Sequence, residues 1–475
     1  MDRDIILQFD DPAADLAAVG GKGANLARLA RAGFPVPPGF LVGTAGYRAF
    51  VEANDLQAAI LTIARAVPAG DPAALEVASA AIRDRFAAGT MPPAVAAALA
   101  AGYAELGSPP VAVRSSATAE DLPDMSFAGQ QDTYLNIVGP ATLQDAVVRC
   151  WASLWTARAL GYRARNGIAP EDVALAVVVQ EMVPSEASGV LFTANPLTGL
   201  RDEVVIDATL GLGEALVSGL VEPDHYVVDA TATRILHKTL GDKALAIHGQ
   251  AGGGTVTVSA DAAKHQALPD AAIRELAALG QRVAAHYGTP QDLEWGWADA
   301  RLYLLQARPI TSLFPLPAGV SADPLRVLFS FASVQGVLDP YTPFGQDAIQ
   351  MVAAGGARMF GFPYTFETQP VLRTAAERLF IDITGPVRHR IGRRLISRAG
   401  GALDPGAYQA LSTLLADPRL AATRGRIHSS TLGHLGRGLG PVLPRLLLAL
   451  IWPEARYRAM RRQTDAAIAR LTARG

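Results

Sequence analysis

The amino-acid sequence predicts an α+β protein, in which helix-rich and strand-rich segments occupy separate parts of the chain. Residues 55–106 are rich in alanine and predict successive helices. Residues 172–183, DVALAVVVQEMV, form an unbroken valine-rich run that is typical of a central strand with both faces buried. Residues 292–310 contain two alternating segments on either side of residues 298–300, a pattern that predicts a β-hairpin.

Composition narrows the function classes that the chain can serve. Its 475 residues are enough for two or three domains, and a net charge of −2 gives no electrostatic basis for binding nucleic acid or an anionic membrane. Cys150 is the only cysteine, so no intramolecular disulfide is possible. The first residues are charged where a signal peptide is apolar, and the apolar run 446–452 is too short to span a membrane. We expect a cytoplasmic protein.

Residues 111–138, VAVRSSATAEDLPDMSFAGQQDTYLNIV, carry the densest set of polar groups. The apolar run 111–113 predicts a buried strand that delivers Arg114 and two serines to its end. Acidic residues, Gly129 and Thr133 follow. A guanidinium, hydroxyls, backbone N–H groups and acids that can hold a metal together suit an oligophosphate ligand. The alternative is a polar surface loop after an edge strand.

Residues 19–42 place Lys22 among Gly20, Gly21 and Gly23, immediately before a helix that Gly33 ends. An ammonium group at a helix N-terminus is suited to contact a phosphate, because the helix N–H groups face the same anion. The segment is not a P-loop, since a glycine follows the lysine where Ser or Thr is required. The alternative is a glycine turn with a purely structural role.

The end of the valine-rich strand turns polar at Gln180 and Glu181, followed by Met182 and Val183. Ligand contacts are common at such strand ends. Free backbone groups at 181–183 are expected to hydrogen-bond a purine edge between the apolar side chains of Met182 and Val183. The alternative is a simple strand exit.

The segments between these stretches predict scaffold. A capping box at 142–145 predicts the start of a helix with an apolar face. Trp151 and Trp155 follow at core spacing. Strands are expected at 188–197 and 204–207, and the glycines at 252–254 predict a hairpin loop.

The hairpin at 292–310 predicts a metal and phosphate site. If it folds about Asp299 or Ala300, Glu294 lies opposite Leu305 or Gln306. In the second register, Glu294, Gln306 and Arg308 share one face of the hairpin. A carboxylate and an amide oxygen can together bind magnesium, and the arginine can bind a phosphate. The alternative is an ordinary surface hairpin with a weak salt bridge.

Six stretches in order resemble the ATP-binding domain of the phosphoenolpyruvate-utilising enzymes. They are GGKGANLARL, AVRSSATAEDLPDMSFAGQQDTYLN, QEMV, SGVLFTANP, GLGEALVSGLVEPD and LEWGWADARLYLLQARPIT, within residues 1–312. The family includes phosphoenolpyruvate synthase, pyruvate phosphate dikinase and rifampicin phosphotransferase. The resemblance implies a fold similar to ATP-grasp, which clamps ATP between two α+β lobes.

The resemblance implies ATP and Mg²⁺ as cofactors, and it implies phosphate contacts for five residues. Lys22 and Arg114 contact phosphates, and Gly129 and Thr133 lie in the phosphate-covering loop. Arg308 contacts the γ-phosphate. Lys22, Arg114 and Arg308 are therefore the expected catalytic residues.

Adenine and metal contacts follow from the same resemblance. Gln180 and the backbone of residues 181–183 hold the adenine. Glu294 and Gln306 are similar to magnesium ligands of the family.

The rest of the chain resembles rifampicin phosphotransferase in part. Residues 313–324 form a proline-bearing linker, and residues 325–475 are expected to be mostly helical. The stretches TPFG and RLFIDIT resemble the start of the antibiotic-binding domain of rifampicin phosphotransferase. The chain is then expected to stop partway through that domain.

No histidine stands in a TGGxxSH-type phosphohistidine motif. We therefore expect an ATP-dependent phosphotransferase component that passes phosphate to a histidine carrier in a separate or missing domain. The expected acceptor is a small molecule, either rifamycin-like or pyruvate as in phosphoenolpyruvate synthase. A non-catalytic nucleotide-binding module is the alternative from another class.

Overall fold

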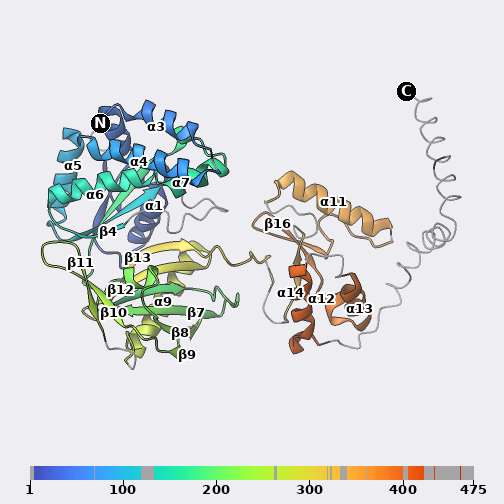
Figure 1. Cartoon of the computed structure of the whole chain (residues 1–475). Coiled ribbons are helices and arrows are strands. Elements are labelled where there is room, and N and C mark those ends of the chain that lie inside the picture. Colours follow the sequence, from blue (N-terminus) through green and yellow to red (C-terminus); the bar gives the residue numbers. More distant parts are fainter. Residues whose placement is uncertain are drawn as a thin grey trace. The chain divides into compact units, whose positions relative to one another are not determined.

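A computed structural model describes residues 5–68, 70–118, 133–260, 265–317, 319–320, 324–331, 340–359, 361–399 and 405–421, with residues 433 and 461. The chain divides into two compact units, Met1–Phe314 and Pro315–Gly475 (Figure 1). Gly129, a predicted phosphate contact, lies outside the described residues.

The first sheet of the N-terminal unit has five strands, and every neighbouring pair is antiparallel. In sheet order they are β1 (Ile6–Gln8), β2 (Gly39–Val42), β5 (Leu175–Glu181), β3 (Val111–Ala117) and β4 (Thr133–Ile137). The middle strand is the predicted valine-rich one, and its first six residues are buried. The prediction of a central strand covered on both faces is confirmed.

Helices cover one face of this sheet: α2 (Thr44–Ala53), α3 (Leu56–Ala66), α4 (Pro72–Ala88), α5 (Pro93–Glu105), α6 (Pro140–Ser153) and α7 (Ala157–Arg165). The predicted helical stretch 55–106 is confirmed, and Trp151 and Trp155 are core residues. The capping box is wrong. Helix α6 begins at Pro140 with Gly139 as its N-cap in place of Thr142, and the Thr142 hydroxyl donates to the Gly139 carbonyl at 2.9 Å instead of capping a helix N–H.

Helix α1 (Leu16–Arg31) packs on the opposite face of the first sheet. Its Leu26 lies with Leu41 and Val178 in one apolar cluster, whereas Leu29 belongs to the core of a second sheet. A single helix therefore contacts both sheets of the unit.

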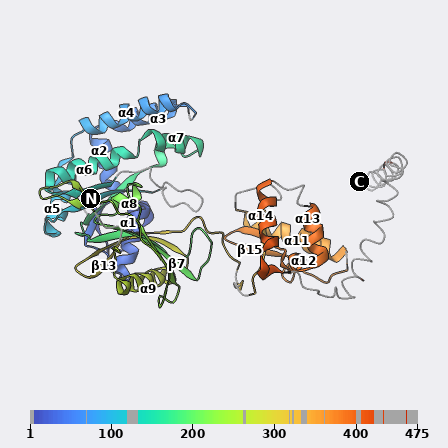
Figure 2. The same cartoon turned by 60° about the horizontal axis from the view of Figure 1, so that its bottom comes forward.

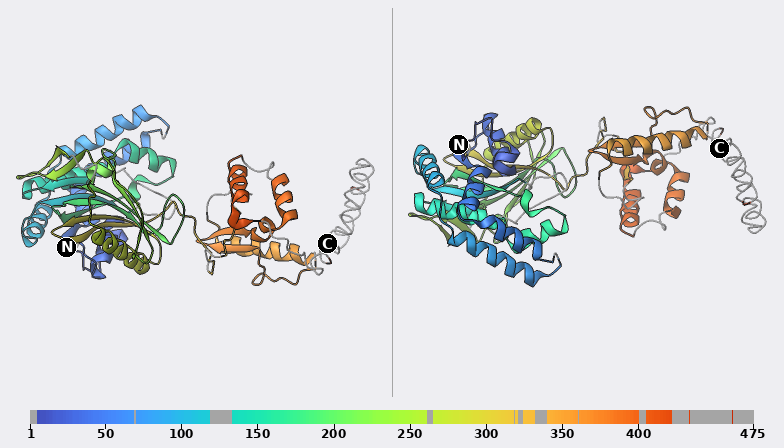
Figure 3. Two further views of the ribbon diagram at one scale, coloured as in Figure 1. Left: turned by 90° about the horizontal axis from the view of Figure 1, so that it is seen from below. Right: turned by 90° about the horizontal axis from the view of Figure 1, so that it is seen from above.

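The second sheet has six strands: β13 (Arg301–Pro309), β12 (Gln291–Ala298), β6 (Ala187–Phe192), β7 (Glu203–Leu210), β8 (Asp224–Asp229) and β9 (Ile235–Thr239). Helix α9 (Asp270–Tyr287) packs on one face through residues such as Ile273 and Val283. Figures 2 and 3 show α9 on the side of the unit opposite α3 and α4. Each sheet thus forms a hydrophobic core of its own between one of its faces and the helices packed on that face.

A two-stranded hairpin, β10 (Leu245–Gly249) and β11 (Thr255–Ser259), turns at the glycines that predicted its loop. It packs on the short helix α8 (Glu214–Val217). Among the described helices, none has the length and apolar character that crossing a membrane requires.

The described part of the C-terminal unit combines helices with a small sheet that the sequence did not predict. The sheet order is β14 (Leu328–Ser330), β16 (Arg378–Asp382) and β15 (Leu372–Ala375). The helices are α11 (Pro343–Met359), α12 (Thr384–Arg388), α13 (Arg390–Ala399) and α14 (Pro405–Ala416). The RLFIDIT stretch supplies β16.

Candidate functional site

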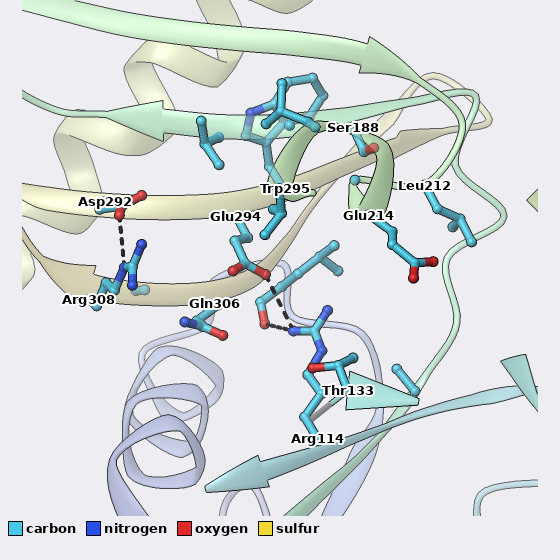
Figure 4. Close-up of a pocket in the computed structure, with 18 of the residues that line it drawn as sticks. Arg114, Thr133, Ser188, Leu212, Glu214, Asp292, Glu294, Trp295, Gln306 and Arg308 are labelled. Atoms are coloured by element: carbon cyan, nitrogen blue, oxygen red, sulfur yellow. Dashed lines mark hydrogen bonds and ion pairs between the residues drawn. The ribbon is translucent and has the colours of Figure 1, made fainter. Parts of the chain in front are cut away.

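A cavity of about 830 Å³ lies between the two sheets of the N-terminal unit. Ten of the residues that the sequence singled out line it: Lys22, Arg114, Thr133, Gln180, Glu181, Met182, Val183, Glu294, Gln306 and Arg308. Figure 4 shows Arg114 and Thr133 on one side of the cavity, facing Glu294 and Gln306. Segments more than 250 residues apart in the sequence thus meet at one site.

Arg114 connects the two sides of the cavity. It lies in the middle of β3, which runs from Val111 to Ala117, and not at the end of the strand as predicted. Its side chain is only 11% exposed and lies 3.8 Å from Glu294, measured from Nη1 to Oε2. Nη1 also donates to the carbonyl of Leu305 at 2.9 Å. A guanidinium from the first sheet is therefore held by two groups of the second.

The glycine turn before Lys22 has a structural cause. Gly20 interrupts helix α1 with a φ of 68°, and a Cβ there would lie 2.2 Å from the carbonyl oxygen of Ser116. The Ser116 hydroxyl donates to the Val19 carbonyl at 2.6 Å and accepts from the Gly23 N–H at 3.0 Å. This hydroxyl stabilises the turn, and neither serine of the pair is among the residues that line the cavity.

Lys22 follows this turn and reaches the cavity. Its Nζ donates to the carbonyl of Ser115 at 3.2 Å, so a β3 backbone group orients the ammonium. The lysine and Arg114 therefore approach the cavity from neighbouring elements, α1 and β3.

The hairpin formed by β12 and β13 turns at Asp299 and Ala300, whose φ angles are both positive, at 51° and 58°. Glu294 pairs directly with Gln306, which confirms the second of the two predicted registers. The next pair is Trp295 with Leu304, so Leu305 is the extra residue of a β-bulge.

Because of the bulge, side chains two positions apart on β13 face different surroundings, one the hydrophobic core and the other the cavity. Leu304 is buried in the core beneath α9, whereas Gln306 and Glu294 line the cavity. Without an extra residue, Leu304 and Gln306 would share a face, because side chains alternate with a period of two. The Leu305 carbonyl, at the bulge, is the acceptor for Arg114.

Asp292 is a cavity residue that the sequence reasoning missed. It is buried and pairs across the hairpin with Arg308, whose Nε donates to its Oδ2 at 2.8 Å (Figure 4). Burial raises the pKa of the Asp292 carboxyl, and Arg308 opposes this shift. The register that pairs Glu294 with Gln306 also places Asp292 opposite Arg308. The Asp292–Arg308 pair could therefore have been predicted from the hairpin pattern.

The strand exit at 180–183 differs from the expectation. The N–H of Glu181 donates to Pro38 at 2.8 Å, and the N–H of Met182 donates to Pro110 at 2.9 Å. These two groups are therefore not free for a purine. The N–H of Val183 donates no hydrogen bond to another described residue. It is the remaining backbone donor of the three.

Helix α8 supplies a further wall that the sequence reasoning did not assign. Leu212, Glu214, Leu216 and Val217 line the cavity. They lie in the GLGEALVSGLVEPD stretch, which served only to support the family resemblance. Gly211 and Gly213, a glycine pair that is weak evidence by itself, were the sequence feature that could have indicated this wall.

Glu294 and Gln306 fit a magnesium ion as a partial ligand set. Among the described residues, no group of three or more His, Cys, Asp or Glu side chains is placed to hold a metal. A paired carboxylate and amide facing a cavity nevertheless suit Mg²⁺, which takes oxygen ligands and obtains the remainder from water and phosphates.

Cationic, carboxylate and amide side chains thus line one cavity, and the part of the chain that supplies them matches a known protein family. Residues 16–316 match the family model described as "Pyruvate phosphate dikinase, AMP/ATP-binding domain". The chain belongs to this family of phosphoenolpyruvate-utilising enzymes, as its motifs predicted.

Similar proteins come from two groups of this family. A rifampicin phosphotransferase of Streptomyces sviceus is 42% identical over 85% of this chain and 45% of its own length. One from Bacillus subtilis is 39% identical over 84% of this chain and 45% of its own length. A phosphoenolpyruvate synthase of Pyrococcus furiosus is 42% identical over 63% of this chain and 42% of its own length. The chain spans about half the length of the curated relatives it matches.

Proposed function

We propose that the N-terminal unit binds Mg-ATP in the cavity between its two sheets, with the sheets acting as the two lobes of an ATP-grasp-like fold. The observation that carries this proposal is the convergence of ten sequence-predicted residues on one cavity. The family to which residues 16–316 belong supports ATP as the nucleotide.

The cavity has two chemically different ends. Met182 and Val183 form an apolar end for the adenine, with Gln180 and the Val183 N–H as polar contacts. Lys22 and Arg114 bring positive charge to the other end, which suits the phosphates.

Around the phosphates, Thr133 extends the polar wall beside Arg114, its partner across β3 and β4. Glu294 and Gln306 would hold the magnesium, which neutralises phosphate charge when bound. Arg308, oriented by Asp292, would contact the γ-phosphate. Transfer then depends mainly on positioning and charge stabilisation by these side chains.

We further propose that the phosphate passes to a histidine carrier outside the described residues, and then to a small-molecule acceptor as in rifampicin phosphotransferase. The match to those relatives covers about 85% of the chain, and therefore extends beyond the N-terminal unit, residues 1–314. A compartment with a reducing environment, the cytoplasm, suits Cys150, a buried cysteine that forms no disulfide.

Pyruvate is the second candidate acceptor. It is supported by the equal identity, 42%, of the Pyrococcus furiosus phosphoenolpyruvate synthase, whose match covers 63% of the chain. Phosphorylation assays with rifampicin and with pyruvate, using the chain together with a histidine domain of a relative, distinguish the two. Nucleotide binding without transfer to either acceptor would favour a binding module.

Calorimetry with ATP and Mg²⁺ tests the binding proposal. Arg114→Ala should weaken ATP binding by about 1.5–3 kcal/mol, the scale of a hydrogen bond to a charged group. Arg83→Ala is the matched control, since Arg83 is exposed on α4 and does not line the cavity. Equal ATP affinity in the wild type and Arg114→Ala, with both folded, would refute the assignment.

A further inference from the structure

Glu214 is an acidic residue of the cavity that has no partner in the contacts described so far. It is the first residue of α8 and lines the cavity. Figure 4 shows its carboxylate extending from α8 into the space between the sheets. The residue is exposed, and its side chain forms no ion pair or hydrogen bond with another described residue. Its acceptor atoms therefore face the ligand space.

Packing fixes where Glu214 lies along the cavity. The next residue, Ala215, is fully buried in a cluster with Leu212 and Ile247. Met182, from the apolar end, packs against this cluster. Leu135, two residues beyond Thr133 on the β4 strand, packs against it as well. Helix α8 is thus held between the end assigned to adenine and the wall assigned to phosphate.

The chemistry of a carboxylate decides which part of a nucleotide it can meet there. An ionised carboxylate only accepts hydrogen bonds, and it repels the anionic phosphates. Between its base and its phosphates, ATP offers one pair of donors, the 2′- and 3′-hydroxyls of the ribose. Two carboxylate oxygens can accept from both hydroxyls at once.

We propose that Glu214 binds the ribose hydroxyls and makes the site selective for ribonucleotides. This inference rests on the proposed binding of ATP. It assigns α8 as the wall that recognises the sugar, between the Met182–Val183 wall for the base and the Arg114 wall for the phosphates.

Calorimetry of the whole chain with Mg²⁺ and three nucleotides tests the proposal: ATP, 2′-deoxyATP and 3′-deoxyATP. The wild type should bind each deoxynucleotide about tenfold more weakly than ATP, since each lacks one charge-assisted hydrogen bond. In Glu214→Ala, ATP affinity should fall by about tenfold or more, and the difference between the three nucleotides should disappear.

Glu222→Ala is the matched control, because it removes an exposed carboxylate of the same segment that does not line the cavity. It should keep both the ATP affinity and the selectivity. Thermal unfolding of each variant verifies that it is folded.

Two results separate the failure of this inference from failure of the proposed function. If the folded wild type binds none of the three nucleotides, the proposed function fails and this inference with it. If it binds all three equally, or if Glu214→Ala weakens all three by the same factor, ATP binding stands and the ribose assignment is overturned.

Discussion

Arg114 and Glu294 show how single residues couple the two sides of the cavity. The separation of 3.8 Å between their charged atoms gives weak attraction in the absence of a ligand, and Glu294 remains 33% exposed. A carboxylate that is neither buried nor tightly paired can exchange this contact for a metal ion. Its role should therefore appear in metal dependence and not in stability.

Glu294→Gln should raise the Mg²⁺ concentration needed for nucleotide binding by about tenfold or more, since a neutral amide is a weaker magnesium ligand than a carboxylate. The unfolding free energy should change by less than about 1 kcal/mol, because the side chain is partly exposed and the amide has nearly the same shape. Calorimetry at a series of Mg²⁺ concentrations and denaturant unfolding measure the two quantities. A large loss of stability with unchanged Mg²⁺ dependence would make Glu294 a structural residue.

Asp292 should make stability depend on pH in the opposite direction to a typical paired carboxylate. Its ordinary pKa is 3.8, and burial raises the pKa in the folded state. The folded protein therefore holds the proton to higher pH than the unfolded chain. As pH rises from the ordinary pKa through the pKa of the folded state, Asp292 loses its proton and becomes a buried charge. The unfolding free energy therefore falls over this pH range.

Asp292→Asn removes this titration, so the stability of the wild type relative to the variant should decrease as pH rises through that window. Denaturant unfolding of both proteins at a series of pH values measures the difference. A difference that stays constant or increases with pH would show that the pairing with Arg308 outweighs the burial of Asp292.

Strand alternation was sufficient to predict which residues of the β12–β13 hairpin lie side by side. Glu294, Gln306 and Arg308 follow from the hairpin pattern, and Asp292 could have been found in the same way. Prediction failed at Glu181 and Met182, because their N–H groups donate to Pro38 and Pro110, which lie far away in the sequence. Local pattern contains no information about such partners.

At the scale of elements, a clasp connects the β10–β11 hairpin to the first sheet. Asn136 of β4 donates from Nδ2 to the carbonyls of Gln250 at 2.8 Å and Gly254 at 2.6 Å. Its own carbonyl accepts from the Gly254 N–H at 2.9 Å. Asn136 adopts a φ of 55°, which asparagine and glycine tolerate better than other residues. The hairpin packs on α8, so the clasp supports a wall of the cavity.

Asn136→Gly tests this clasp without adding backbone strain, because glycine readily adopts the same φ. Losing the two side-chain hydrogen bonds should destabilise the hairpin by about 1–3 kcal/mol. Hydrogen exchange should therefore become faster in residues 245–259 and stay unchanged in β5, which serves as the internal control. Uniform acceleration in both segments would instead indicate loss of global stability.

Elements with strong periodicity could be predicted, whereas irregularities could not. The valine-rich β5 and the helices between residues 55 and 106 follow from composition and pattern. The bulge at Leu305 does not, because the Arg114 guanidinium that donates to the Leu305 carbonyl lies far away in the sequence. The start of α6 was misplaced because a matching capping-box sequence is weaker than the turn that Gly139 forms with a φ of 91°.

At the scale of the whole molecule, the positions of the histidines decide whether one of them can accept phosphate in the cavity. The sequence has eight histidines, and none among the described residues lines the cavity. His225 on β8 is paired with Asp207 at 2.7 Å, outside the cavity lining. His428 and His434 lie outside the described residues. A histidine carrier would thus have to enter the cavity from elsewhere.

Without an added histidine domain, the chain should consequently hydrolyse ATP slowly and form no stable phosphohistidine, because no histidine among the described residues lines the cavity to accept the phosphate. Incubation with ATP labelled at the β- or γ-phosphate, followed by mapping of base-stable and acid-labile label, measures both the hydrolysis and any phosphohistidine.

Addition of the histidine domain of a rifampicin phosphotransferase relative should produce label on that domain. Arg308→Ala should reduce the rate of this labelling by at least about tenfold, because charge stabilisation of the γ-phosphate is lost. Arg83→Ala serves again as the control. Stable label on one of the eight histidines in the absence of any added domain would show that this chain carries its own acceptor, and it would contradict the proposed separation of ATP binding from the carrier.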